Sequence, residues 1–540
     1  MAKLLLLSLA GLATLSHALT PNCSVATFEA IVPPNATVVL VQEVSQNATF
    51  TVPVADTGFP TDPARLPALC AVQIEMPTEA GTTFNYGLFL PKNWTGRFLT
   101  SGNSGFAGGV NYLEMGAGAS YGFAAMSTDT GHDSSVFGNA SWAVDPEAVT
   151  DWAWRAMHLS VVAAKEVVEA YYSKNITYSY YNGCSTGGRQ GLKEVEEFPG
   201  DFDGAVVGAP AWWTVHLQLW NVQTSLYNYP TTAPGYIPNQ MFSVIAAESL
   251  KQCDPQDGVT DNIISDPRGC HLRIETLLCA GNTTTDCLTP DQLDTLYHYY
   301  NDWVIGNQTF VFPHFEIGSE GLWGGGSSPD LDYPQYFLGL GTNFTADDWD
   351  PEYLVALSEA LNPGNATADN FDLSPFYKKG SKIIHYHGMA DNSIATASSV
   401  YFYEHVLRTL KSQGIDLDDF YRFFLVPGME HCSGTPSTQN APWYIGGTTQ
   451  ASVIGDDSAG YWIHSKPGFD NAQHDVLLAL IDWVENDTAP TQVIATKWND
   501  ESTLDYVINQ RPICMYPQQA KYVGTGNTSV ATNWECQSIY

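Results

Sequence analysis

Hydrophobic positions in the first half of the chain form short apolar runs separated by longer amphipathic stretches. Runs typical of buried strands occur at residues 85–91, 96–100, 121–128, 176–181 and 205–209. Residues 151–172 carry apolar side chains at helical spacing, and Thr150 is placed to cap the start of that helix. Strands separated by helices predict a mainly parallel sheet.

The pattern changes in the middle of the chain and then returns. Residues 226–379 are rich in Tyr, Pro, Asn, Asp and Gly, with short helical patterns such as residues 290–301. Strand patterns resume at residues 383–387 and 423–426, with a helical one near 397–413 between them. We therefore predict an α/β fold whose core comprises residues 19–225 and 380–540, with residues 226–379 inserted as a lid domain.

The first 18 residues predict export. Lys3 precedes an apolar run over residues 4–9, and small residues lead to a cleavage site after Ala18. This run is too short to span a bilayer, and no other uninterrupted apolar stretch approaches the roughly 20 residues of a membrane helix. We expect residues 1–18 to be a signal peptide and the mature protein to be secreted, without a membrane anchor.

Composition and glycosylation signals agree with an extracellular globular protein. Hydrophobic residues make up 44% and aromatic residues 12% of the chain, which favours a packed core over disorder. The net charge of −35 argues against nucleic acids and anionic membranes as partners, because both are polyanions. Twelve Asn-x-Ser/Thr sequons indicate a secretory glycoprotein. They begin at Asn22, Asn35, Asn47, Asn93, Asn139, Asn175, Asn282, Asn307, Asn343, Asn365, Asn486 and Asn527.

A candidate nucleophile lies directly after the strand pattern at residues 176–181. Gly183-x-Ser185-x-Gly187 stands between this strand and a helix, which is the setting of a nucleophile elbow in an α/β-hydrolase core. Glycines suit the sharp turn, which lifts the serine hydroxyl clear of the sheet. The backbone N–H of Thr186 is then free to stabilise an oxyanion, and a second donor is expected from the loop at residues 102–105, at Gly105.

The other members of a triad are expected later in the chain, in the order acid and then histidine. Asp391 follows the strand pattern at residues 383–387, and His431 follows the one at 423–426. We predict that Ser185 attacks an ester, that His431 is the general base and that Asp391 orients it. His385 and His387 are interpreted as sheet or pocket residues, and His132 as a loop-bonding residue.

Ten cysteines in an oxidising compartment predict five disulfides. Sequence proximity suggests Cys23–Cys70, Cys253–Cys270, Cys279–Cys287 and Cys514–Cys536. The remaining pair, Cys184 and Cys432, flanks the predicted nucleophile and the predicted base, so a bridge would hold their loops together. An even cysteine count and this compartment argue against Cys184 as a thiol nucleophile.

Cys184-Ser185, Asp391 and His431-Cys432 together resemble the CS-D-HC motif of the fungal tannase and feruloyl esterase family. Further segments of the resemblance are residues 101–108 and 198–204, so it covers nearly the whole mature chain. It implies an α/β-hydrolase core, a lid, a disulfide beside the Ser and His, and hydrolysis of phenolic acid esters. The motif is specific to the family and not to one substrate, and we expect feruloyl esters of plant cell-wall polysaccharides, xylan among them. Galloyl esters are the alternative, and a non-catalytic wall-binding glycoprotein is a more distant one.

An acidic loop in the predicted lid offers oxygen ligands for a hard cation. Asp254, Asp257 and Asp261 lie within eight residues of one another around a glycine, and Val259 and Ile263 offer carbonyls. The spacing is not that of an EF-hand, and alone it is also typical of a solvated turn. The family resemblance implies a structural calcium ion in such a lid loop, and we take calcium as the expected cofactor.

Overall fold

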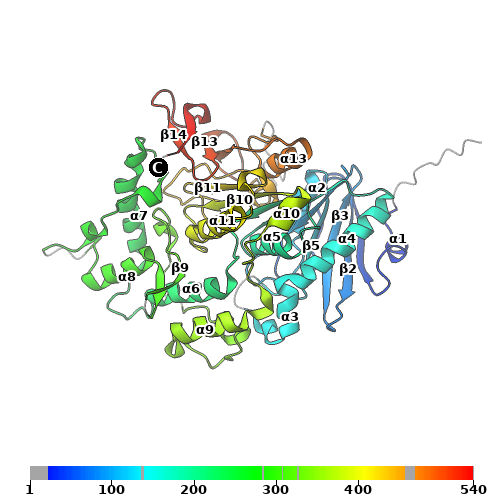
Figure 1. Cartoon of the computed structure of the whole chain (residues 1–540), viewed down its shortest axis with the longest axis horizontal. Coiled ribbons are helices and arrows are strands. Elements are labelled where there is room, and N and C mark those ends of the chain that lie inside the picture. Colours follow the sequence, from blue (N-terminus) through cyan, green and yellow to red (C-terminus); the bar gives the residue numbers. More distant parts are fainter. Residues whose placement is uncertain are drawn as a thin grey trace, which may run out of the picture.

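A nine-stranded sheet forms the centre of the computed structural model (Figure 1), which describes residues 22–135, 139–281, 285–306, 308–324, 328–455 and 469–538. The expected signal peptide and the sequon residues Asn282 and Asn307 lie outside these ranges. The first four strands of the sheet pair antiparallel, and the strands from β5 to β11 pair parallel. Their order is β1 (Thr37–Val44), β2 (Leu69–Pro77), β3 (Thr83–Pro91), β5 (Ala124–Thr128), β4 (Arg97–Ser101), β6 (Tyr178–Cys184), β7 (Gly204–Gly208), β10 (Lys382–Gly388) and β11 (Tyr421–Val426). The predicted mainly parallel sheet is confirmed.

Helices cover both faces of the sheet. Neighbouring residues of a strand point to opposite faces, so they pack against different helices. Val207 belongs to the apolar cluster of α4 (Ala156–Tyr172), α5 (Thr186–Glu197) and α11 (Thr396–Lys411). Val206 belongs to the cluster of α13 (Val476–Asn486) on the opposite face. Near the antiparallel strands, α2 (Tyr112–Ser120) packs on that second face. Two short helices complete the layers, α1 (Val25–Glu29) and α12 (Gly447–Ala451).

The helix expected to begin at Thr150 begins earlier, so that expectation is wrong. Asp145 caps α3 (Pro146–Thr150) by accepting from the N–H of Glu147, and Pro146 occupies the first helical position. The chain then passes through a π-helical turn at Asp151–Arg155 into α4. The Thr150 hydroxyl donates back to the carbonyl of Pro146 at 2.9 Å, so Thr150 lies inside the helix.

Between β7 and β10 the chain leaves the sheet and builds a second apolar cluster, which lies to one side of the core in Figure 1. The expected boundary at residue 226 falls inside α6, so the chain departs from the sheet earlier, directly after β7. The helix predicted at residues 290–301 is present as α8, capped by Thr289. The elements of this insertion are α6 (Thr214–Tyr227), α7 (Asn239–Cys253), α8 (Pro290–Tyr300), β8 (Trp303–Ile305), β9 (Thr309–Phe312), α9 (Pro351–Leu361) and α10 (Ser374–Lys379).

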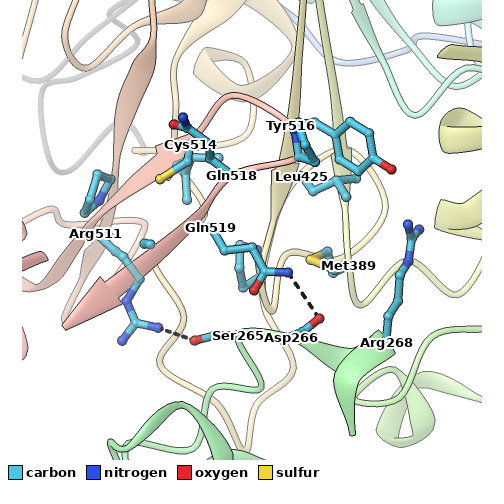
Figure 2. Close-up of a pocket in the computed structure, with 15 residues that line it drawn as sticks. Ser265, Asp266, Arg268, Met389, Leu425, Arg511, Cys514, Tyr516, Gln518 and Gln519 are labelled. Atoms are coloured by element: carbon cyan, nitrogen blue, oxygen red, sulfur yellow. Dashed lines mark hydrogen bonds between the residues drawn. The ribbon is translucent and has the colours of Figure 1, made fainter. Parts of the chain in front are cut away.

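The C-terminal segment, for which the sequence predicted no strands, forms two small hairpins beside the insertion. These are β12 (Gln492–Trp498) with β13 (Val507–Cys514), and β14 (Gln519–Tyr522) with β15 (Trp534–Gln537). Figure 2 shows how they hold the insertion: Arg511 donates to the Ser265 hydroxyl at 3.1 Å, and Gln519 donates to the Asp266 carboxylate at 3.2 Å. Among the described helices, none combines the length and apolar character that a membrane span requires.

Candidate active site

Ser185 occupies a strained turn between β6 and α5. Its φ of 64° and ψ of −125° are rare for a residue with a side chain, and such strain is typical of nucleophile elbows. The N–H of Ser185 donates to the carbonyl of Gly208, and its own carbonyl accepts from Ala211, both at 3.0 Å. A Cβ at Gly183 would meet the carbonyl of Gly187 at 2.8 Å, which explains why glycine is needed before the serine. The Ser185 hydroxyl does not cap α5, so it is left for other chemistry.

The loop expected to supply an oxyanion donor lies directly against this elbow. A Cβ at Gly187 would meet the carbonyl of Asn103 at 2.9 Å. The Asn103 backbone N–H donates to the side chain of Gln190 on α5 at 2.9 Å, and Thr186 donates through its hydroxyl to the carbonyl of Gly105 at 2.9 Å. Thr186 is the first residue of α5, where a backbone N–H has no acceptor within the helix. The backbone of residues 103–105 and the N–H of Thr186 are therefore neighbours.

Asp391 and His431 form a hydrogen-bonded pair at the ends of β10 and β11. The Nδ1 of His431 lies 2.7 Å from Oδ2 of Asp391. Asp391 is fully buried, and its Oδ1 accepts the backbone N–H groups of Ser393 at 2.8 Å and Ile394 at 2.9 Å. Burial alone would raise the pKa of Asp391, but the charge of His431 and hydrogen bonds from two histidines hold that pKa well below its usual range. Asp391 is therefore ionised and accepts hydrogen bonds only.

A disulfide joins the loops of Ser185 and His431. Cys184 and Cys432 are bonded, with their Cα atoms 6.0 Å apart. The end of β6 and the loop after β11, two strands that are not adjacent in the sheet, are thus tied together beside the serine and the histidine. The structure also contains the four pairs expected from sequence proximity, Cys23–Cys70, Cys253–Cys270, Cys279–Cys287 and Cys514–Cys536.

Three other histidines were assigned structural roles from the sequence. His132 is stacked on Trp142 with ring centroids 3.9 Å apart, and its Nδ1 lies 2.9 Å from the Ser134 hydroxyl, so it bonds its own loop as predicted. His385 is buried within the sheet layer. His387 does more than the sequence suggested, because its Nε2 lies 3.0 Å from Oδ2 of Asp391. A histidine within a strand pattern does not show what its ring contacts, so no sequence signal reveals this contact.

The insertion is attached beside the loops that carry Asp391 and Gly105 and close to the loop of His431. Asn392 donates to the carbonyl of Leu322 at 3.2 Å, and Gln439 donates to the carbonyl of Gly318 at 2.9 Å. The ring of Phe106, which follows Gly105, packs against Phe337 with centroids 4.8 Å apart. The insertion therefore borders the site on the Asp391, His431 and Gly105 sides, where a lid would shape the substrate pocket.

The carboxylates of the acidic loop in the insertion are held by the protein in different ways. Asp254 accepts the backbone N–H groups of Asp261 and Asn262 at 3.1 and 2.9 Å, and Asp257 accepts the Ser265 hydroxyl at 2.5 Å. Oδ2 of Asp261 lies 2.5 Å from the guanidinium of Arg511, while its buried Oδ1 has no hydrogen-bond partner. Burial raises the pKa of Asp261, against the effect of the guanidinium.

This donor set suits a hard cation, since it consists of oxygens and one buried oxygen lacks a partner. The three carboxylates are nevertheless not gathered to within 4.8 Å of one another, a spacing that only His158, Glu194 and Asp201 meet among the described His, Cys, Asp and Glu residues. Burial would lower the pKa of His158, but hydrogen bonds to the two carboxylates raise it to about 9. His158 is therefore paired with these carboxylates, its Nδ1 lying 2.8 Å from Oδ2 of Asp201.

Comparison with known proteins agrees with this geometry. The sequence model of the family described as "Tannase and feruloyl esterase" matches residues 70–317 and 333–537. The chain belongs to this family. It is 36% identical over 480 residues to a probable feruloyl esterase B-1 of Aspergillus oryzae, covering 87% of this chain and 84% of the relative.

Solved structures of the family have the same fold. The crystal structure of feruloyl esterase B from Aspergillus oryzae superposes with a TM-score of 0.84 at 35% identity, covering 94% of this chain and 98% of that one. The tannin acyl hydrolase from Aspergillus niger, at 22% identity and a TM-score of 0.73, shares the fold over 95% of each chain. As a member of this family, the chain is a carboxylic ester hydrolase with an α/β-hydrolase core.

Proposed function

We propose that this protein is a secreted feruloyl esterase that hydrolyses hydroxycinnamoyl esters of plant cell-wall polysaccharides through Ser185, His431 and Asp391. One observation carries the assignment of the site: His431 is hydrogen-bonded to a buried carboxylate and is tied by the Cys184–Cys432 bond to the loop of a strained serine. Similarity to proteins named feruloyl esterase B, at 36% identity, supports the substrate class.

The proposed mechanism assigns one task to each group. His431 removes the proton of Ser185 as the oxygen attacks the ester carbonyl, and then gives that proton to the leaving alcohol. Asp391 stabilises the imidazolium that forms in between. The backbone N–H of Thr186 and a donor at Gly105 stabilise the tetrahedral oxyanion. Water then releases the phenolic acid from the acyl-enzyme by the same steps.

The proposed location is extracellular. Residues 1–18 have the pattern of a signal peptide, and five disulfides are typical of an oxidising compartment. The twelve sequons are the proposed sites of N-glycosylation. With a net charge of −35, nucleic acids and anionic membranes are unsuitable partners, and the expected partner is the polysaccharide-linked ester itself.

We expect methyl ferulate, caffeate or p-coumarate to be cleaved with a higher kcat/KM than methyl gallate. A cinnamoyl group has a two-carbon spacer between ring and carbonyl, so its ring lies farther from Ser185 and can rest on flat apolar surface. A galloyl pocket must instead satisfy three adjacent hydroxyls, and a site built to bond hydroxyls rejects analogues without them. Initial rates on the four methyl esters measure the preference directly. The reverse ranking would make the protein a tannase with the same mechanism.

We also propose a structural calcium ion in the acidic loop, held by the carboxylates of Asp254, Asp257 and Asp261 and the carbonyls of Val259 and Ile263. The ion would satisfy the unpartnered oxygen of Asp261 and fix the loop next to Arg511. It is remote in sequence from Ser185, so its role would be in stability.

Chelation should therefore lower the melting temperature by a few degrees, because a ligand that binds only the folded state stabilises it. Asp257→Ala should cause the same loss and make the protein insensitive to chelator, while turnover of methyl ferulate persists. Asp347→Ala, which removes an exposed carboxylate elsewhere in the insertion, is the matched control. If metal analysis of the purified protein finds no calcium, the loop is a solvated acidic turn.

A further inference from the structure

A chain of buried side chains continues from Asp391 into the core, away from His431. Nε2 of His387 lies 3.0 Å from Oδ2 of Asp391, and Nδ1 of His387 lies 2.7 Å from the Ser399 hydroxyl. The same hydroxyl lies 2.9 Å from Nε2 of His385, whose Nδ1 lies 2.8 Å from the hydroxyl of Tyr421. The two histidines, Ser399 and Tyr421 are each 0% exposed, so this row of hydrogen-bonded side chains is closed to solvent.

The fold explains why these groups meet. His385 and His387 are two residues apart on β10 and therefore point to the same face of the sheet. That face is covered by α11, whose first turn supplies Ser399 between the two rings. Tyr421 begins the neighbouring strand β11 and reaches the far side of His385. The strands β10 and β11, which lead into the loops of Asp391 and His431, thus also supply His385, His387 and Tyr421.

The direction of the hydrogen bonds can be deduced from the end nearest the triad. Nε2 of His387 faces the ionised carboxylate of Asp391 at 3.0 Å and the carbonyl of Ile394 at 3.1 Å. Both oxygens can only accept, so Nε2 carries a hydrogen. The Nδ1 of a neutral His387 must then accept, and the Ser399 hydroxyl donates to it.

The far end of the chain favours the same direction. With its hydrogen given to His387, Ser399 accepts from Nε2 of His385, and Nδ1 of His385 accepts from Tyr421. In the reverse direction the phenol hydrogen of Tyr421 would have no acceptor, because His385 is its only hydrogen-bond partner in the described ranges. A buried donor without a partner is unfavourable. Burial lowers the pKa of His385 well below its usual value, which also keeps that ring neutral.

We propose that His387 is a positioning residue for ester hydrolysis, held as the neutral Nε2–H form by Ser399, His385 and Tyr421 so that it fixes the Asp391 carboxylate toward His431. This inference rests on the proposed function. A neutral donor orients Oδ2 of Asp391 and compensates its negative charge only in part. That charge remains available to the imidazolium of His431 when the proton of Ser185 is transferred.

Replacing His387 with Leu should lower kcat by about tenfold or more, because the Asp391 carboxylate is no longer held in the orientation in which it accepts from His431. KM for methyl ferulate should change little, since His387 is buried behind Asp391. The acid limb of the profile of kcat/KM against pH should move to higher pH. Without the His387 hydrogen bond, the Asp391 carboxylate stabilises the imidazolium of His431 more strongly, and the base is neutral only at higher pH. His387→Gln can still donate from its amide, so its acid limb should lie closer to that of the wild type.

The control is His216→Leu. His216 is also a buried histidine, bonded to a carboxylate of Glu359 at 2.9 Å and to the carbonyl of Val311 at 2.7 Å, but it has no contact with Asp391. The His216→Leu variant should have a lower melting temperature, and the acid limb of its pH profile should not move. If His387→Leu does the same, or if His387→Gln is no better than Leu, the positioning role is overturned. Should the Leu variant fail to fold, Ser399→Ala tests the chain, with the expected result a smaller shift in the same direction and the contrary result an unshifted limb.

Failure of the proposed function would look different. Every active variant in this series should still be labelled at Ser185 by a fluorophosphonate, because His387 does not touch the nucleophile. An active enzyme that is not labelled at Ser185 would refute the assignment of the nucleophile, whatever the behaviour of His387.

Discussion

Replacing Ser185 with Ala should reduce ester hydrolysis by about a million-fold, to the rate left by binding and the oxyanion donors alone. The melting temperature should stay near that of the wild type, since Ala adopts the same backbone turn and the Ser185 hydroxyl caps no helix. Steady-state kinetics on methyl ferulate, thermal unfolding and fluorophosphonate labelling measure the three properties. Ser412→Ala, at the end of α11, is the matched control and should be fully active.

Asp391→Asn extends this test to the base. It should lose about ten-thousand-fold in kcat while remaining labelled more slowly at Ser185, because the aspartate orients and stabilises the histidine and does not react itself. A Ser185→Ala enzyme with activity close to the wild type would show that the elbow has been misassigned. It would also exclude the covalent mechanism proposed for this chain.

Removal of the Cys184–Cys432 bond should cost activity far more than it costs stability. Cys184→Ala with Cys432→Ala frees the loops of the nucleophile and the base from each other, and a misplacement of about 1 Å can lower a rate by about 100-fold. The melting temperature should fall only modestly, because four other disulfides and the sheet remain. Measurement of kcat/KM beside thermal unfolding separates the two effects.

The matched control removes a disulfide of the insertion. Cys279 and Cys287 are eight residues apart in sequence, and their loss should leave kcat/KM near the wild-type value. Non-reducing peptide mapping should recover Cys184 linked to Cys432 from the mature protein. A free thiol at either position, or equal losses of activity from both double variants, would contradict the proposed role of this bond.

The parallel part of the fold could be predicted from the sequence because each of its strands is a short apolar run. The runs at residues 205–209 and 383–387 correspond to β7 and β10, which are buried on both faces and carry a continuous signal. The edge strand β1 was missed although residues 38–41 form a short apolar run, and its positions are mostly exposed or half-buried. The C-terminal hairpins β12–β13 and β14–β15 were also missed, and their contacts with the insertion, such as Arg511 with Asp261, are distant in sequence.

The site was predictable to the extent that chain order and neighbouring residues reveal it. The order Ser185, Asp391, His431, with a cysteine beside the first and the last, predicted the pair and the bridge that the structure contains. The prediction that a helix starts at Thr150 was wrong, because Asp145 followed by Pro146 is the stronger signal for a helix start. The contact between His387 and Asp391 could not be deduced, since a histidine inside a strand pattern does not show what its ring meets.

The sequence separation of 248 between Cys184 and Cys432 has a consequence for when the proposed hydrolytic activity would arise during synthesis. Ser185 is synthesised first. The whole insertion must follow before β10 can pair with β7 and before Asp391 and His431 are synthesised. Such long-range pairing is late in folding, because a large loop has to be closed. Along the proposed secretory route, the bond between the two loops forms only in an oxidising compartment. Along that route, the nascent chain would be a latent esterase, and the cytosol that produces it would not be exposed to the finished active site.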